Sequence, residues 1–215
     1  VRTGPASGEA LVNARRLALS EGRGTRTREG LVLLEVRESA AVRTDRLRAL
    51  APEGAGFKSV PLKRRLRGRE SDEPFGGAGS SFCALEGAGL VVLEPSPERE
   101  LVLLELRQDF VYLRESRLVA FENLLRYENG RLPVAEPGPL PMVQLAGEGL
   151  VVFEARKSLA ALPVTAERGV SVRAACVLGW TGRLLGQAVP LGESPAQGTG
   201  FVTFSGDGAV LVEEP

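Results

Sequence analysis

The chain has 215 residues, enough to bury a substantial core, and its 27 basic and 27 acidic residues balance to a net charge of zero. A neutral chain has no overall field that attracts nucleic acid or an anionic membrane, so any such binding needs a local patch. The sequence contains no histidine, which excludes a Ser-His-Asp triad and argues against the histidine-held metal of a cupin-like enzyme. We therefore expect no metal and no cofactor.

The two cysteines and the apolar runs bear on the compartment. Cys83 and Cys176 are flanked by apolar or small residues and are predicted to be buried free thiols, which suits a reducing compartment. No apolar run approaches the roughly 18 residues that span a bilayer, and no signal peptide is recognisable. We expect a cytoplasmic protein without an integral membrane segment. Because the chain starts with Val1, we also expect it to be truncated.

The first 30 residues are predicted to be a ragged N-terminal segment, followed by a single all-β domain over residues 31–215. Within the N-terminal segment, residues 11–19 fit either a helix or a strand, and residues 22–29 form a polar loop. The first expected strands cover residues 31–36 and 41–50.

Residues 51–81 are rich in glycine, proline and charge and predict an unusually long loop, a feature that is often mobile or functional. Six basic residues in it are candidates for binding an anionic ligand or RNA: Lys58, Lys63, Arg64, Arg65, Arg67 and Arg69. Because Glu70, Asp72 and Glu73 follow directly, a solvated loop that compensates its own charge is the simpler interpretation.

An apolar segment with a Gly-x-Gly core occurs three times, about sixty residues apart: FCALEGAGLVVL at 82–93, MVQLAGEGLVVF at 142–153 and FVTFSGDGAVLV at 201–212. Each copy predicts two strands joined by a tight turn or a bulge. A phosphate-binding loop would need a third glycine and a helix after it, and both are missing. An earlier, degenerate copy corresponds either to Gly22-Arg23-Gly24 or to Gly30.

A second phrase alternates with the first: LVLLEVRESAAVRTDRLRAL at 31–50, LVLLELRQDFVYLRESRLVAF at 101–121 and a weaker VSVRAACVLGW at 170–180. It aligns three arginines, Arg43, Arg114 and Arg173. We expect these to point to solvent, and a ring of three guanidinium groups is the alternative. It also aligns three large apolar residues, Leu50, Phe121 and Trp180, of which Phe121 and Trp180 are expected to be buried.

Together the two phrases define a unit of two strand pairs. It covers approximately 31–81, 82–133 and 142–191, with a closing strand pair at 201–215. We predict a triplicated short double-stranded β-helix or β-sandwich with pseudo-three-fold repeats. Residues 113–127 alone resemble an amphipathic helix, but the aligned phrases favour strands. Glu128-Asn129-Gly130 predicts a turn.

Two stretches, LVAFENLLRYENGRL at 118–132 and VLGWTGRL at 177–184, with the Gly-x-Gly segments between and after them, resemble the family named for altered inheritance of mitochondria. The resemblance covers roughly residue 31 to the C-terminus. It implies a fold like that of the tryptophan-responsive RNA-binding attenuation protein, and it carries no catalytic residues over. The family's mitochondrial member is linked to the organisation of membrane complexes, which implies scaffolding. This chain departs from many relatives in its long basic stretch.

We therefore expect a non-enzymatic interaction or scaffold module that binds a protein partner or itself, as a homo-oligomer. An anion- or RNA-binding module that uses residues 58–69, with weak nucleic-acid binding, is the alternative, and a cupin-like enzyme is a further one. The apolar strands at 31–35 and 201–212 either pair with each other within the chain, or one of them pairs with a neighbouring molecule.

Overall fold

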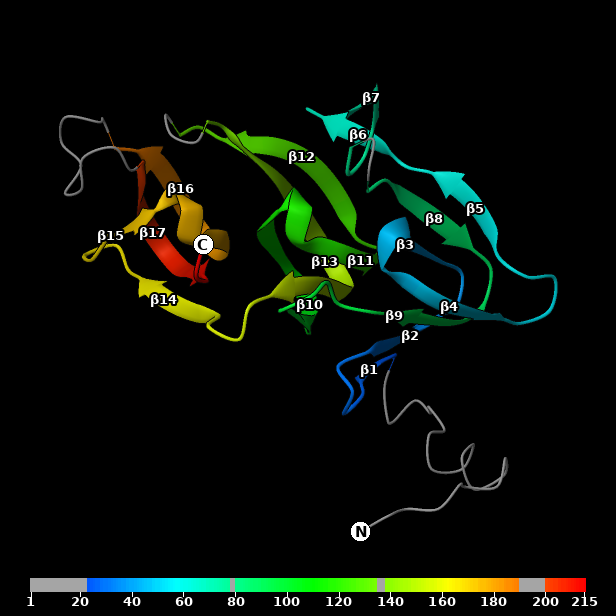
Figure 1. The fold of residues 1–215 in the computed structure, drawn as a ribbon. Coiled ribbons are helices and arrows are strands. Elements are labelled where there is room, and N and C mark those ends of the chain that lie inside the picture. The colour runs from blue at the N-terminus through cyan, green and yellow to red at the C-terminus, as the bar shows by residue number, and fades with distance from the viewer. Residues whose placement is uncertain (1–22, 78–79, 135–137, 190–199) are drawn as a thin grey trace, which may run out of the picture.

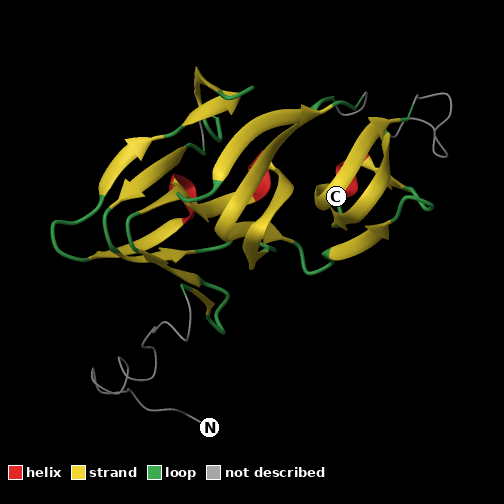
Figure 2. Cartoon of the chain, turned by 180° about the vertical axis from the view of Figure 1, so that it is seen from behind, coloured by secondary structure: helices red, strands yellow, loops and turns green. Residues whose placement is uncertain are grey.

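The computed structural model describes residues 23–77, 80–134, 138–189 and 200–215. These residues form antiparallel β-sheets, as predicted, and Figures 1 and 2 show strands throughout. The helices of this part of the chain are 3-10 turns of three residues each, and none is long and apolar enough to cross a membrane. The prediction for residues 11–19 lies outside the described residues.

The N-terminal part contains seven strands and one turn: β1 (Gly24–Arg26), β2 (Val32–Val36), β3 (Ser39–Arg43), η1 (Thr44–Arg46), β4 (Leu47–Pro52), β5 (Lys58–Pro61), β6 (Lys63–Leu66) and β7 (Arg69–Pro74). The predicted polar loop at 22–29 is therefore wrong in part, because β1 pairs with β2. The prediction of a long loop at 51–81 is also wrong, because these residues contain three strands. Strand β5 pairs with β8, and Arg67 and Gly68, with φ of 54° and 75°, connect the hairpin β6–β7.

The middle part contains β8 (Phe82–Glu86), β9 (Gly89–Leu93), β10 (Glu100–Arg114), η2 (Glu115–Arg117), β11 (Leu118–Glu122), β12 (Arg126–Leu132) and β13 (Leu140–Ala155). Residues 113–127 are strands and a 3-10 turn, so preferring strands to a helix is confirmed. The turn predicted at Glu128-Asn129-Gly130 is wrong, because these residues lie within β12 and pair along β13.

The C-terminal part contains β14 (Ala160–Val164), β15 (Val170–Arg173), η3 (Ala174–Cys176), β16 (Val177–Ala188) and β17 (Phe201–Val212). One sheet has the order β1-β2-β9-β4, and a larger one has the order β14-β17-β16-β10-β13-β11-β3-β8-β5, with β12 on β13 and β15 on β17. The predicted pairing of residues 31–35 with 201–212 is wrong, because β2 pairs with β1 and β9, whereas β17 pairs with β14, β15 and β16.

The Gly-x-Gly segments are bends and not hairpin turns. The first one separates β8 from β9, which belong to different sheets, and the other two lie inside the continuous strands β13 and β17. Gly147 and Gly149 have φ of 129° and 155°, which disfavours a side chain. Opposite them, the register of β10 shifts between Arg107 and Asp109. In the second copy the bulge therefore lies in β10, opposite the glycines, and not in the Gly-x-Gly segment itself. The predicted tight turn between two paired strands is wrong.

A second irregularity recurs directly after each 3-10 turn. The register shifts between Leu47 and Ala49 against β9, between Leu118 and Ala120 against β13, and between Val177 and Gly179 against β17. The three strand–turn–strand segments β3–η1–β4, β10–η2–β11 and β15–η3–β16 thus share one local geometry.

The aligned apolar residues after these turns differ in burial. Phe121 is 1% exposed and Trp180 is 6% exposed, which confirms the prediction that both are buried. Leu50, at the aligned position, is 45% exposed. Among the described residues, strands β11 and β16 each have a neighbouring strand on both sides, whereas β4 has one on a single side. The greater exposure of Leu50 thus coincides with the side of β4 on which no described strand pairs.

We expect Gly179→Ala to lower the free energy of unfolding by about 1–3 kcal/mol or more, since overpacking a tight contact costs this much. An added Cβ would lie inside contact distance of the Tyr112 carbonyl oxygen, which is backbone and cannot move aside. Gly130→Ala is the matched control, because a Cβ there meets no atom within 4 Å. Urea unfolding of both variants measures the difference, and equal midpoints would contradict this packing.

Candidate functional site

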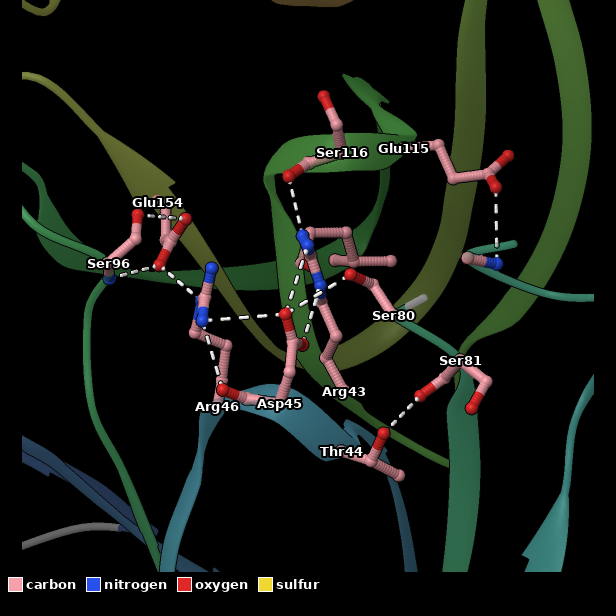
Figure 3. A network of polar contacts seen from close by, with 12 residues as sticks. Arg43, Thr44, Asp45, Arg46, Ser80, Ser81, Ser96, Glu115, Ser116 and Glu154 are labelled. Carbon is pink, nitrogen blue, oxygen red and sulfur yellow. Dashed lines mark hydrogen bonds and ion pairs between the residues drawn. The ribbon is translucent and has the colours of Figure 1, made fainter. Parts of the chain in front are cut away.

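The contact between β3–η1 and η2–β11 centres on Arg43, which is 8% exposed. Its guanidinium donates to the carbonyl oxygens of Ser116 and Leu118 and lies 3.0 Å from the Asp45 carboxylate (Figure 3). The expectation that Arg43 points to solvent is therefore wrong. The turn after β10 exposes carbonyl groups that need donors, and a long side chain from the adjacent strand supplies them.

A buried ion pair lies beside this contact. The Arg46 guanidinium is 2.8 Å from the carboxylate of Glu154, a residue that is only 2% exposed. The backbone N–H and the hydroxyl of Ser96 also donate to this carboxylate, at 2.6 and 2.8 Å (Figure 3). With three donors, the Glu154 carboxylate is well satisfied for a buried charge.

The same arrangement recurs one strand–turn–strand segment further on. The Arg114 guanidinium donates to the carbonyl oxygens of Ala174 and Ala175 in η3, so the expectation of solvent exposure is wrong here too. Arg173 is exposed, and its side chain has no hydrogen bond or ion pair to any described residue. Because Arg43 and Arg114 each bind the turn of the next segment, the three arginines do not form a ring.

At this second contact, between the β10 and β16 segments, Glu213 is the buried carboxylate equivalent to Glu154 at the first contact. Its carboxylate accepts from the side chains of Arg99 and Arg117 at 3.1 and 2.9 Å and from the backbone N–H of Arg156 at 2.8 Å. Burial by itself raises the pKa of this carboxyl, but the hydrogen bond from Arg156 and the two guanidinium charges outweigh burial, so the pKa of Glu213 lies below its ordinary value.

A third buried carboxylate fixes the basic stretch to the rest of the molecule. Glu115 accepts hydrogen bonds from the Arg64 guanidinium, from the backbone N–H of Gly76 and, at 3.1 Å, from the amide of Asn129. The Asn129 side chain in turn accepts from the backbone N–H of Arg65 at 3.0 Å. These contacts explain why residues 58–74 lie as strands against the sheet.

The structure does not gather the six predicted basic residues into one site. Three of them pair with carboxylates: Lys58 with Glu86 at 3.1 Å, Lys63 with Asp72 at 3.5 Å and Arg64 with Glu115 at 2.5 Å. The Arg65 guanidinium lies over the Tyr127 ring, 5.8 Å from its centre. Arg67 and Arg69 are exposed at the tip of the β6–β7 hairpin, where no described carboxylate pairs with them.

Two pockets lie near these contacts. One, of about 360 Å³, is lined by Arg43, Arg64, Arg114 and Glu115. The other, of about 300 Å³, is lined by apolar and polar residues around Tyr112 and Trp180, whose rings stack with centres 4.6 Å apart. Burial raises the pKa of the Tyr112 hydroxyl. The described residues hold no group of three or more His, Cys, Asp or Glu side chains that could bind a metal ion.

Sequence reasoning missed the buried carboxylates Glu115, Glu154 and Glu213 and the aromatic pocket. The aligned arginines were a visible signal of recurring contacts, but their partners are backbone oxygens, which carry no mark in a sequence. Both cysteines are free thiols, and Cys83 is buried as predicted, but the prediction of burial is wrong for Cys176, which is half-buried.

These features define an all-β protein of paired strand–turn–strand segments. The crystal structure of protein SPYM3_0169 from Streptococcus pyogenes is similar in fold, with a TM-score of 0.66 and 17% identity over 90% of this chain and 93% of that one. Residues 62–213 match the family described as mitochondrial biogenesis AIM24, so the chain belongs to that family. The predicted family is confirmed. No curated protein matches the chain.

We expect Arg43→Ala to lower the free energy of unfolding by about 1–3 kcal/mol, because it leaves the Ser116 and Leu118 carbonyl groups without this donor. Arg173→Ala is the matched control at the aligned, exposed position and should stay within about 0.5 kcal/mol. Chemical denaturation at low protein concentration measures both, and equal effects would contradict the role assigned to Arg43.

The contribution of Glu213 to stability depends on pH. Because the pKa of Glu213 is lower in the folded than in the unfolded state, its stabilisation is complete above the unfolded value and is lost as the pH falls through the folded value. We expect Glu213→Gln to be less stable than the unmodified protein at pH 7. The gap should narrow as the pH falls below about 4.5. Denaturation at several pH values tests this, with the exposed Glu214→Gln as a control that should show little effect at any pH.

Proposed function

We propose that this protein is a non-enzymatic interaction module, a scaffold that binds a protein partner or further copies of itself in the cytoplasm. The observation that supports this function best is the open sheet edges. Within the described residues, one sheet order ends at β1 and β4 and the other at β14 and β5. An unpaired edge presents N–H and C=O groups to which another chain can add a strand.

We also propose that the three strand–turn–strand segments are repeats of one unit in a short double-stranded β-helix, with a fold like that of the attenuation protein. The matching register shifts after η1, η2 and η3 support this. The equivalent contacts of Arg43 and Arg114 with the following turns support it as well.

The buried carboxylates support a role without catalysis. A general base needs a lone pair that can reach a substrate proton, and protein donors already occupy most of the acceptor sites of these carboxylates. Glu115, Glu154 and Glu213 are each engaged by three hydrogen-bond or ion-pair donors from the protein. These groups therefore stabilise the fold, and the proposal includes neither a cofactor nor a metal.

Binding of an anionic ligand or RNA is the second candidate function. The pocket lined by Arg43, Arg64 and Arg114 favours it, as do the exposed Arg67 and Arg69. The three guanidinium groups in the pocket already donate to protein oxygens, which leaves less of each for a ligand. The salt dependence of binding distinguishes the two candidate functions, because the affinity for a polyanion falls steeply between about 50 and 200 mM salt.

We expect the protein to self-associate at micromolar concentration and to dissociate on dilution. Light scattering on a size-exclusion column, repeated over a hundred-fold dilution, measures the mass. A mass greater than one chain that falls with dilution supports association through open edges. The mass of a single chain at every concentration would remove self-association and leave only a role with a different protein.

A further inference from the structure

The strand–turn–strand segments contact one another by a single rule. The strand before one 3-10 turn pairs, antiparallel, with the strand after the next turn. Strand β3 pairs with β11 through Ala41↔Phe121, and β10 pairs with β16 through Tyr112↔Trp180. In both cases the paired residues lie at the same positions relative to their turns, so the two contacts have the same register.

The side chains follow the rule as well. Arg43 and Arg114, each directly before a turn, donate to carbonyl oxygens of the following segment's turn. Arg46 and Arg117, each at the end of a turn, pair with the carboxylates of Glu154 and Glu213. The two contacts are thus two copies of one interface. In each copy, the strand before the turn of one segment, which we call its front, contacts the strand after the turn of the next segment, which we call its back.

This rule leaves one surface unused at each end of the series. Strand β15, before η3, pairs with β17 alone, and β4, after η1, pairs with β9 alone among the described residues. The side chains there are correspondingly exposed. Leu50 is 45% exposed where Phe121 and Trp180 are covered by a neighbouring strand, and Arg173 is exposed where Arg43 is buried.

We propose that a second copy of this chain covers these two surfaces, with β15 of one copy paired to β4 of the next. Extending the rule by one step gives the antiparallel register Val172↔Ala49, Ser171↔Leu50 and Val170↔Ala51. The Arg173 guanidinium then donates to the turn η1 of the next copy, near Asp45. This inference rests on the proposed interaction function and names its partner.

The occupant follows from continuity with the contacts inside the chain. By the same rule, the strand that pairs with β4 must be one that precedes a 3-10 turn. Strands β3 and β10 already pair in this way within the molecule, so β15 is the strand of this kind that remains among the described residues. Figure 1 shows β15 and β4 at opposite ends of the molecule, so one chain does not join them by itself. The contact is head-to-tail and builds a ring or an open filament, not a two-fold dimer.

The new contact is weaker than the two internal ones. Cys176 stands where Arg46 and Arg117 stand, so the ion pair with a buried carboxylate is absent. Leu50 also offers less apolar area than Phe121 or Trp180. Association between copies is therefore reversible on dilution.

Disulfide trapping tests the register. Two variants are made in a Cys176→Ser background, one with Leu50→Cys and the other with Ser171→Cys, while the native Cys83 is buried. Directly opposed residues of antiparallel strands have Cα atoms about 4.5–5.5 Å apart, within disulfide range. We expect a linked pair of chains when the two variants are mixed under mild oxidation, and neither variant should form one alone.

Leu66→Cys is the matched control, because Leu66 is also 45% exposed but lies on β6. Its mixture with Ser171→Cys should give no linked pair. Equal linking by Leu66→Cys, or linking of Leu50→Cys to itself, overturns the head-to-tail register. If light scattering shows association but the Leu50→Cys and Ser171→Cys mixture does not link, only this inference fails. If light scattering gives the mass of a single chain at every concentration, the proposed self-association is contradicted as well.

A second variant checks the surface without oxidation. Leu50→Lys should reduce the associated mass to that of one chain at micromolar concentration, whereas Leu66→Lys should leave it unchanged. Because the Leu50 side chain is exposed in the single chain, its unfolding midpoint at low concentration should stay the same. Retained association of Leu50→Lys would exclude β4 as the contact.

Discussion

Arginine side chains that reach into the turn of a neighbouring segment hold this structure in register. Each 3-10 turn interrupts a strand, and carbonyl groups of η2 and η3 receive a donor from the arginine of the preceding segment. A guanidinium group supplies up to five donors in a plane and stays charged when partly buried. Arg43 and Arg114 therefore satisfy the turn and fix the adjacent strand pairing with one side chain.

The ion pairs next to these arginines explain how a chain with a net charge of zero uses its charges. Buried carboxylates are stable only when they are paired and hydrogen-bonded. Glu154 and Glu213 meet this condition with guanidinium groups and backbone donors from other strands. Glu115 does the same for the basic stretch. Acidic and basic residues that seem independent in the sequence are thus largely partners in the fold.

The sequence predicted what depends on local pattern, which includes the strands, the recurrence of the Gly-x-Gly segments and the burial of Phe121 and Trp180. It failed where a distant partner decides. Residues 58–74 carry polar side chains on both faces and look like a loop, yet β8 and Glu115 hold them as strands. Asn129 marks a turn by local preference, but its amide bridges Arg65 and Glu115 inside β12. The alignment of the repeated phrases identified Arg43 and Arg114, but it could not identify the backbone carbonyl groups that accept their hydrogen bonds.

The differences among the aligned positions fit their places in the series. The two internal contacts join parts of one chain, so large aromatic residues can be buried there without a risk of aggregation. A phenylalanine or tryptophan at the end, on the open strand β4, would expose a large apolar surface next to unpaired backbone groups, which promotes uncontrolled pairing. With Leu50 in that place, and Cys176 instead of an arginine at the other end, the proposed end-to-end contact would be weaker than the two internal ones. In the proposed head-to-tail assembly, such an edge favours reversible association over permanent closure, because association that depends on concentration is lost on dilution.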